Sequence, residues 1–435
     1  MPTRGATVSN NNDALIEIRD VKNKQLASSI QRKLFRKSPL SPKCCIFRVP
    51  TILRRHNKSA YEPHIISIGP FHHGKKALKA MEKIKLWYLH DLISRAPTPN
   101  TSLEGFIKEI SELEKSARDC YAEPINLEGD KFVEMMVVDG CFIIELFRKR
   151  NSQTVLVDKN DPTFNMPWVQ LALQNDLLLL ENQLPWCVLE CLFNLTTTVH
   201  HQQGTPSLAD LALKFFRYMM LMTVTAKPNS RFETKHLLDL VRSSLLSPIA
   251  DTEPDYTGWE VIPSVTDLLQ SGVRFKTGNP ENILNVKFKK GVLEIPSILL
   301  QENAETIFRN LIAFEQCDHE RTNRITSFAI LLDNLINTSK DVDFLSQKGI
   351  IVNFLSSEDI SLFFNRLYND ALVNQFYYGT LCWDLNKYRQ KPWNRRCATL
   401  KREYFNTPWS ILSFIAALMI LLFTFTQTLF TILSY

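Results

Sequence analysis

The sequence of 435 residues lacks the short motifs of the common catalytic and metal sites. Its nine cysteines include no Cys-x-x-Cys pair, so their spacing does not indicate a zinc site, and scattered thiols are typical of a reducing compartment. Neither a Gly-x-Ser-x-Gly elbow nor a His-Glu-x-x-His pair occurs, which leaves the hydrolase and metalloprotease templates without their required residues. We therefore assign no catalytic, cofactor-binding or metal-ligating residue, and we expect no cofactor.

The chain also lacks a tract of lysine and arginine interleaved with aromatic residues, so no nucleic-acid partner is expected. Its formal net charge of +6 is modest, and much of the excess lies near the two ends of the chain. The basic group nearer the C-terminus consists of Arg389, Lys391, Arg395, Arg396, Lys401 and Arg402.

No charged residue occurs from Thr407 to Tyr435, and the stretch from Trp409 to Ile432 is mainly apolar. A helix of this length, at roughly 1.5 Å per residue, spans the hydrocarbon core of a bilayer. The pattern predicts a transmembrane anchor over residues 407–433, with the lipid bilayer as a partner. The expected anchor residues are Trp409, Phe414, Leu418, Leu422, Phe425 and Phe430.

The first residues lack the apolar core of a secretory signal, and Pro2 stands where myristoylation requires glycine. We therefore expect a tail-anchored, single-pass protein of the plasma membrane or an endomembrane. Because basic residues beside a span tend to stay cytoplasmic, the bulk of the chain should face the cytosol. Glycosylation sequons at Asn57, Asn100, Asn194 and Asn337 would matter only in a lumen.

The composition predicts a mainly α fold with a few short strands (α+β), built from two packed helical subdomains plus one C-terminal transmembrane helix. About 400 residues exceed what one hydrophobic core usually accommodates, which is why two subdomains are expected. The predicted parts are a disordered basic arm (1–43, with a short helix at 26–35), an N-terminal helical subdomain (44–200), a C-terminal helical subdomain with a β-hairpin (201–400), and the anchor.

Periodicity and capping residues predict the principal elements. Helices are expected from Met81 to Leu92, from a capping box at Thr101, and from Asp130 to Phe147. Further helices should begin after the N-cap residues Ser264 and Ser356. Strands are expected over residues 65–68 and in a hairpin over 286–295.

The stretch Gly69-Pro-Phe-His-His-Gly-Lys75 matches part of a phosphate-binding loop. Lys76 stands where a serine or threonine would hold magnesium, and Pro70 removes one backbone donor. A plain turn between a strand and a helix is therefore the preferred interpretation, and nucleotide binding is the alternative.

Several acids lie in apolar surroundings, namely Asp139, Glu145 and Glu181. A structural carboxylate and a catalytic acid with a shifted pKa look alike in sequence, so geometry must decide between them. The histidine pairs His72-His73 and His200-His201 are adjacent residues that rarely chelate one metal together, and loop histidines are the simpler interpretation.

Eight short stretches together resemble a plant family known as "domain of unknown function 247". They are Cys45-Ile-Phe-Arg-Val-Pro50, Ala60-Tyr-Glu-Pro63, Ile68-Gly-Pro-Phe-His72, Met81-Glu82, Val138-Asp-Gly-Cys-Phe142, Leu180-Glu-Asn-Gln-Leu-Pro185, Leu293-Glu-Ile-Pro296 and Leu311-Ile-Ala-Phe-Glu315. The resemblance implies a plant-specific, single-pass protein of largely unassigned activity. It also implies, for some grass relatives, a role in self-incompatibility as pollen-side recognition determinants.

Two hypotheses follow. The leading one is a membrane-anchored interaction or recognition protein without catalysis, with a protein partner and a role in signalling or in self-incompatibility-like recognition. The alternative is a membrane-associated enzyme that uses the buried acids and the histidines of residues 64–73. Convergence of Asp139, Glu181 and His72 in an open pocket would favour the enzyme, whereas burial in packing would count against it.

Overall fold

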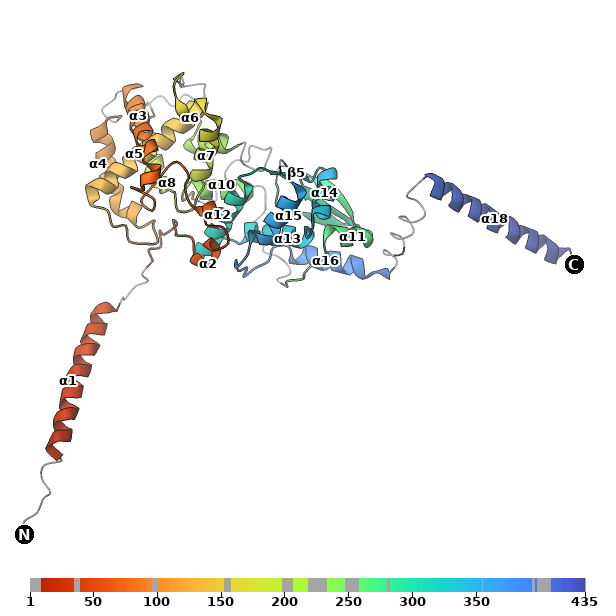
Figure 1. Cartoon of the computed structure of the whole chain (residues 1–435), viewed down its shortest axis with the longest axis horizontal. Coiled ribbons are helices and arrows are strands. Elements are labelled where there is room, and N and C mark those ends of the chain that lie inside the picture. The colour runs from red at the N-terminus through yellow and green to blue at the C-terminus, as the bar shows by residue number, and fades with distance from the viewer. Residues whose placement is uncertain are drawn as a thin grey trace, which may run out of the picture. The chain divides into compact units, whose positions relative to one another are not determined.

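The computed structural model describes residues 9–34, 40–95, 101–151, 158–197, 206–217, 233–246, 258–279, 282–353, 355–392, 396 and 408–434. These residues are mainly helical with five short strands, which confirms the predicted fold class (Figure 1). Contacts between Cα atoms divide the chain into two units, Met1–Cys44 and Cys45–Tyr435.

The first unit contains one long helix, α1 (Ser9–Lys33). The sequence predicts a disordered arm over 1–43 with only a short helix at 26–35, so the helix is longer than expected. Its residues from Arg19 onward include no buried side chain. Lysine, glutamine, alanine and leucine favour helix locally, and at 25 residues α1 exceeds the length below which isolated helices are marginal.

The first helices of the second unit are α2 (Thr51–Arg54), η1 (Ser59–Tyr61), η2 (Lys76–Leu78), α3 (Ala80–Arg95), α4 (Leu103–Arg118), α5 (Gly129–Asn151), α6 (Pro162–Asn165), α7 (Pro167–Asp176), α8 (Trp186–Leu195) and α9 (Leu208–Phe216). Of these, α3, α4, α8 and α9 pack around α5 and form the α5 group, whereas η1 contacts α12. The predicted helix from Asp130 to Phe147 is α5, which contacts α3, α4, α8 and α9. It is buried on nearly every face, as its apolar sequence predicts.

The remaining helices are α10 (Leu237–Leu246), α11 (Val265–Gln270), α12 (Ala304–Cys317), α13 (Arg324–Leu335), α14 (Ser339–Gln347), α15 (Ser357–Leu367) and α16 (Gly379–Gln390). In Figure 1, α10 and α12 lie between the α5 group and helices α11 and α13–α16. The predicted N-caps Ser264 and Ser356 are confirmed, since each hydroxyl accepts the N–H of the residue three positions on. The cap predicted at Thr101 lies one residue later, at Ser102.

Two small sheets accompany these helices. In the first, β1 (Arg274–Gly278), β3 (Val292–Pro296) and β2 (Lys287–Lys289) lie in the order β1-β3-β2. The antiparallel β2–β3 pair is the predicted hairpin, and its turn places Gly291 at φ 75°. In the second sheet, β4 (Ile298–Leu300) pairs in parallel with β5 (Ile351–Asn353).

One continuous hydrophobic cluster runs through this unit and includes side chains from Cys45 to Leu385. It therefore contains members of both predicted subdomains. The division near residue 200 stays a prediction, and residues 198–205, within the expected boundary, lie outside the described part of the chain.

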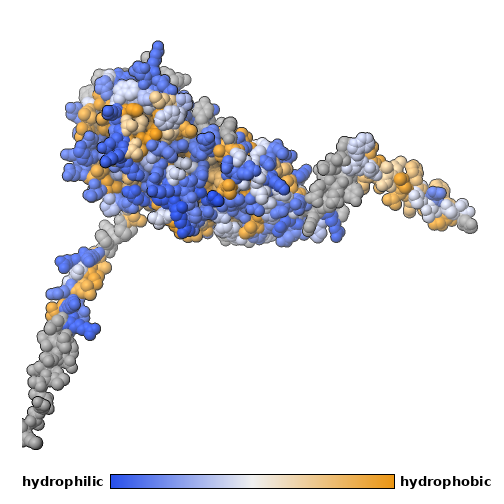
Figure 2. All heavy atoms as spheres, viewed as in Figure 1, coloured by the Kyte–Doolittle hydropathy of each residue, from blue (hydrophilic) through white to orange (hydrophobic). Residues whose placement is uncertain are grey.

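The C-terminal helix is α18 (Pro408–Leu433). Its stretch Trp409–Leu433 has 25 residues, is apolar and long enough to cross a membrane, and is not buried by other parts of the protein. Figure 2 shows it mostly in orange, whereas hydrophilic side chains cover much of the visible face of the helical body. The predicted apolar helix is thus present.

Candidate functional site

The segment 64–68 bends at residues 64 and 65 and enters the interior without joining a sheet, so the predicted strand over 65–68 is wrong. Its backbone donors bond a side chain instead: Asp176 accepts the N–H groups of His64 at 2.9 Å, Ile65 at 2.8 Å and Ile66 at 3.0 Å. Asp176 is fully buried at the end of α7. A buried N–H without an acceptor costs about 1–3 kcal/mol, so this one carboxylate takes the place of a neighbouring strand.

Asn182 and Gln183 continue this pattern in the resemblance segment Leu180–Pro185. The Asn182 amide accepts the N–H of Ile68 at 2.7 Å and donates to the carbonyl of Ile66 at 3.2 Å. The Gln183 amide donates to two carbonyls of its own turn and accepts the N–H of Leu238 in α10 at 3.2 Å. The polar residues that interrupt the apolar run are therefore backbone partners.

Glu181 is the acid that meets the segment before α2. It accepts the N–H of Val49 at 2.7 Å and a guanidinium hydrogen bond from Arg54, and Arg48 lies 3.5 Å away. The Nε2 atom of His72 lies 3.6 Å from its other oxygen. Neither ring nitrogen of His72 has a hydrogen-bond partner among the described residues. Burial, together with Lys75, Arg48 and Arg54, lowers the pKa of His72 to about 3, so the ring is neutral.

Asp139 in α5 pairs with a buried lysine of α3. Its carboxylate lies 2.7 Å from the Lys85 Nζ atom and accepts the N–H of Gly69 at 2.9 Å. Lys85 also donates to Glu82 at 2.7 Å and to the carbonyl of Ser67. Burial lowers the pKa of Lys85, but the charges of Asp139 and Glu82 outweigh this effect and raise that pKa above its ordinary value.

The same contacts argue against a phosphate-binding loop at Gly69. Its N–H already donates to the Asp139 carboxylate, and a Cβ atom at this position would stand 2.6 Å from the carbonyl oxygen of Gln183. With φ at 69°, Gly69 fits a tight turn packed against protein, which agrees with the preferred interpretation.

Glu145 lies in a separate contact between α3 and α5. It forms a two-bonded ion pair with Arg95, one bond of which is 3.0 Å. One turn further along α5, Lys149 bonds Asp91 of α3 at 3.0 Å. Together with Lys85–Asp139, three ion pairs of alternating polarity fix how α3 lies on α5.

The structure therefore brings His72 and Glu181 together but pairs Asp139 with Lys85 and Glu145 with Arg95. All four of the predicted residues are at most 3% exposed. Each acid already accepts hydrogen bonds from cations or backbone N–H groups, which suits a structural carboxylate and gives a substrate no access. Within the described ranges no three histidine, cysteine or acidic residues could hold a metal, and His200-His201 lie outside those ranges.

His236, which sequence reasoning missed, joins the start of the body to α10. Its Nε2 donates to the carbonyl of Cys45 at 3.1 Å, and its Nδ1 accepts the N–H of Asp239 at 3.2 Å. These contacts fix the neutral ring, and burial lowers its pKa to about 3. A lone histidine in a polar stretch carries no sequence signal for this role.

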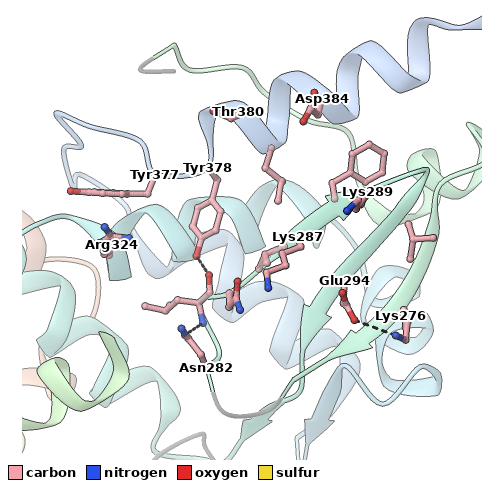
Figure 3. Close-up of a pocket in the computed structure, with 16 residues that line it drawn as sticks. Lys276, Asn282, Lys287, Lys289, Glu294, Arg324, Tyr377, Tyr378, Thr380 and Asp384 are labelled. Carbon is pink, nitrogen blue, oxygen red and sulfur yellow. Dashed lines mark hydrogen bonds and ion pairs between the residues drawn. The ribbon is translucent and has the colours of Figure 1, made fainter. Parts of the chain in front are cut away.

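Sequence reasoning also missed a pocket of about 770 Å³ between the first sheet and α16 (Figure 3). Its charged lining residues are Lys276, Lys287, Lys289, Glu294, Arg324 and Asp384. The buried Tyr378 donates to the carbonyl of Leu284 at 2.7 Å, and burial raises its pKa, so this hydroxyl braces the wall. The alternation of Lys287, Phe288 and Lys289 is the only local hint of the pocket.

The fold is mainly helical, and the buried polar residues described above hold the backbone of its interior segments. The described residues also include one exposed apolar helix, α18. The chain belongs to the family described as plant protein of unknown function (domain of unknown function 247), whose model matches residues 46–423. The predicted resemblance is confirmed.

Two relatives from Arabidopsis thaliana support this assignment. The UPF0481 protein At3g47200 is 31% identical over 421 residues, which cover 90% of this chain and 87% of the relative. The putative UPF0481 protein At3g02645 is 24% identical, over 87% of this chain and 88% of that protein. No solved structure matches the chain significantly.

Removing the ammonium group of Lys85 should destabilise the full chain strongly. We expect Lys85→Met to lower the free energy of unfolding by about 3–5 kcal/mol, because Asp139 is left buried without its cation. Denaturant titration in detergent micelles measures this. The double variant Lys85→Met/Asp139→Asn should recover part of the loss. Lys131→Met, which breaks an exposed ion pair on α5, should leave the unfolding midpoint unchanged. If Lys85→Met unfolded at the same denaturant midpoint as the wild type, the structural role of the Lys85–Asp139 pair would be contradicted.

Acidification should destabilise the body through His236. Below its ordinary pKa of 6.5 the unfolded chain takes up a proton that the folded ring refuses until about pH 3, so stability is complete above pH 6.5 and falls as the pH drops. Between pH 6.5 and about pH 4.5 this group alone should remove about 2–3 kcal/mol. His236→Gln should flatten the pH dependence by that amount, whereas exposed His90→Gln should not. An unchanged slope in His236→Gln would refute the assignment.

Proposed function

We propose that this protein is a membrane-anchored recognition protein without catalysis, in which α18 spans the bilayer and the helical body binds a protein partner. The observation that carries the proposal is the exposed apolar stretch Trp409–Leu433. At roughly 1.5 Å per residue it is about 38 Å long, against a hydrocarbon core of about 30 Å. Exposing so much apolar surface to water is unfavourable, and lipid removes it from water.

The polar residues of α18 suit a lipid environment. The hydroxyl of Thr424 donates to the carbonyl of Ile420 at 2.8 Å, Thr428 donates to Thr424 at 2.7 Å, and Thr431 donates to Gln427 at 2.8 Å. A hydroxyl bonded inside its own helix needs no water, so these threonines add little to the cost of insertion.

The sidedness we propose rests on the basic residues before α18. Arg395, Arg396, Lys401 and Arg402 lie within about 15 residues of the span, the range in which positive charge favours the cytoplasmic side. The body then faces the cytosol, as the sequence predicts.

A recognition role is supported by three exposed apolar residues at the start of α7, Met166, Trp168 and Leu171, of which Trp168 and Leu171 are three positions apart on one side of the helix; we call them the α7 patch. Trp168 is 62% exposed, whereas tryptophan side chains in folded proteins are on average highly buried. Exposed tryptophans in such patches are enriched among the residues that dominate protein interfaces. Recognition is also what the resemblance implies for relatives in self-incompatibility, whereas the sealed acids give the enzyme alternative no comparable support.

Charges in the middle of α18 should release the protein from membranes. We expect Leu418→Lys/Leu422→Lys to move the full chain from the carbonate-resistant membrane pellet to the supernatant, since each lysine at a bilayer centre costs about 2.5–3.5 kcal/mol.

In sealed microsomes, the wild-type body should be digested by added protease and carry no glycan at Asn57 or Asn194.

Leu418→Ala/Leu422→Ala is the matched control and should stay in the pellet. Release of the wild-type chain by carbonate would refute the anchor. A glycosidase-sensitive mass shift at either asparagine would reverse the sidedness but leave the anchor standing.

A photoreactive phenylalanine analogue in place of Trp168 should form an adduct with a discrete protein partner in intact membranes. The same group in place of Leu362, an exposed leucine on α15, should not form it. When this protein and the crosslinked partner are both purified, Trp168→Ala should weaken their binding by about tenfold or more. Equal adducts at both positions, or none at position 168, would count against recognition through this patch.

A further inference from the structure

The first sheet presents a basic face to the pocket, and the strand register builds it. Lys276 of β1 and Lys287 of β2 both stand opposite Glu294 of β3, so the three form one row across the sheet. Two residues along, Lys289 stands opposite Val292 on the same face, because side chains alternate with a period of two. Three lysines thus gather around one carboxylate.

The positive charge of this face is not balanced within the described part of the protein. Glu294 pairs with Lys276 at 3.3 Å, which leaves Lys287 and Lys289 without an ion pair among the described residues. The guanidinium of Arg324 adds a cation on the opposite wall and stacks on the ring of Tyr377 at 4.2 Å. Four cations and two carboxylates line the pocket, which favours an anionic ligand.

Asn282 gives a second, independent indication of a ligand. It is 4% exposed, lines the pocket, and uses its Oδ1 atom to accept the N–H of Leu284 at 2.9 Å. Its Nδ2 group is buried and has no hydrogen-bond partner within the described ranges. Figure 3 shows Asn282 among the residues that line the pocket. A buried donor without an acceptor is costly, and an oxygen-rich ligand in the pocket would supply an acceptor.

The rest of the lining narrows the ligand class. Asp384 on α16 offers a carboxylate, which would repel phosphate and can accept hydrogen bonds from ligand hydroxyl groups, and Thr380 on the same helix offers a hydroxyl that can bond either group. A phosphate group suits the lysines and Asn282, and a hydroxyl-bearing ring suits the α16 side. The pocket volume of about 770 Å³ also exceeds what a single phosphate ion needs.

We propose that this pocket binds a phosphorylated polyol, the headgroup of an inositol phospholipid in the membrane that holds α18. The lipid source rests on the proposed anchor. Residues 391–407 join α16 to α18 and reach at most roughly 60 Å, so the end of α16 stays within that distance of the start of the anchor. Tethering of this kind gives effective concentrations of about millimolar, an advantage that a free inositol phosphate does not share.

The test uses the full chain in nanodiscs of phosphatidylcholine, with or without phosphatidylinositol bisphosphate, and measures the acetylation rate of each lysine by mass spectrometry. The bisphosphate lipid should slow acetylation of Lys287 and Lys289 about tenfold and leave Lys108 and Lys340 unchanged. Discs with phosphatidylserine at equal surface charge should not protect Lys287 and Lys289.

Two variants separate the pocket from general charge. Lys287→Gln/Lys289→Gln should weaken lipid binding by about tenfold or more, whereas Lys108→Gln/Lys340→Gln, which removes two exposed lysines elsewhere, should not. Asn282→Asp keeps the oxygen that accepts the N–H of Leu284 and replaces the unpartnered donor with a carboxylate oxygen, so it should weaken lipid binding; because a buried carboxylate lowers stability, binding is compared under conditions in which circular dichroism shows the variant to be folded. If the two double-lysine variants bound the bisphosphate lipid equally well, the proposed site would be wrong.

A soluble arm adds inositol trisphosphate to lipid-free protein in micelles. Protection of Lys287 and Lys289 there only at higher concentrations supports a membrane-lipid ligand, and protection at lower concentrations than in discs overturns the lipid source. No protection in either arm overturns the pocket. If the chain fails to enter discs, the anchor and the lipid source both fall, while protection in the soluble arm still establishes the phosphate site.

Discussion

The structure depends on one constraint: backbone N–H groups that are buried outside helices and sheets must find acceptors. The segments 45–50 and 64–69 have donors inside the body: the carbonyl of Cys120 accepts the N–H groups of Cys45 and Ile46, and side chains accept most of the others that are buried. Asp176 alone accepts three N–H groups, and Glu181 and Asn182 accept one each. Because every such acceptor must stand in one place, the chain around it is fixed as firmly as in a sheet.

Side chains that bridge distant segments extend this constraint to the rest of the body. Asn310 of α12 accepts the N–H of Leu180 at 2.9 Å and donates to the carbonyl of Ala60 at 2.8 Å. Glu315, five residues on, pairs with Arg242 of α10 and caps α13 through the N–H groups of its first turn. Glu181, Asn182 and Glu315 lie in segments that resemble the plant family, whereas Asp176 and Asn310 lie outside them. The contacts of these three residues are structural, because each accepts at least one backbone N–H of another segment.

Local features were predictable from the sequence and non-local ones were not. The periodicity of residues 130–147 and the caps at Ser264 and Ser356 depend on neighbours within a few positions, and the structure has them as expected. The apolar run 65–68 looks like a strand, but its partner is Asp176, more than a hundred residues away. The basic pocket was missed for the same reason, since parallel pairing of β1 with β3 brings Lys276 to the row that contains Lys287.

Charged residues in this protein fall into two physical classes. Lys85, Arg95 and Lys149 are buried or partly buried, and each is matched by a carboxylate, since an unmatched charge in the interior would cost several kcal/mol. Lys287 and Lys289 stand on an edge strand in water, where an unmatched charge costs little in folding and also discourages strand-to-strand association. Folding therefore explains the first class completely. Folding does not require the second class, so these lysines are available for binding. The Asn282 amide in the same pocket has no acceptor among the described residues, which favours a ligand that carries oxygen atoms.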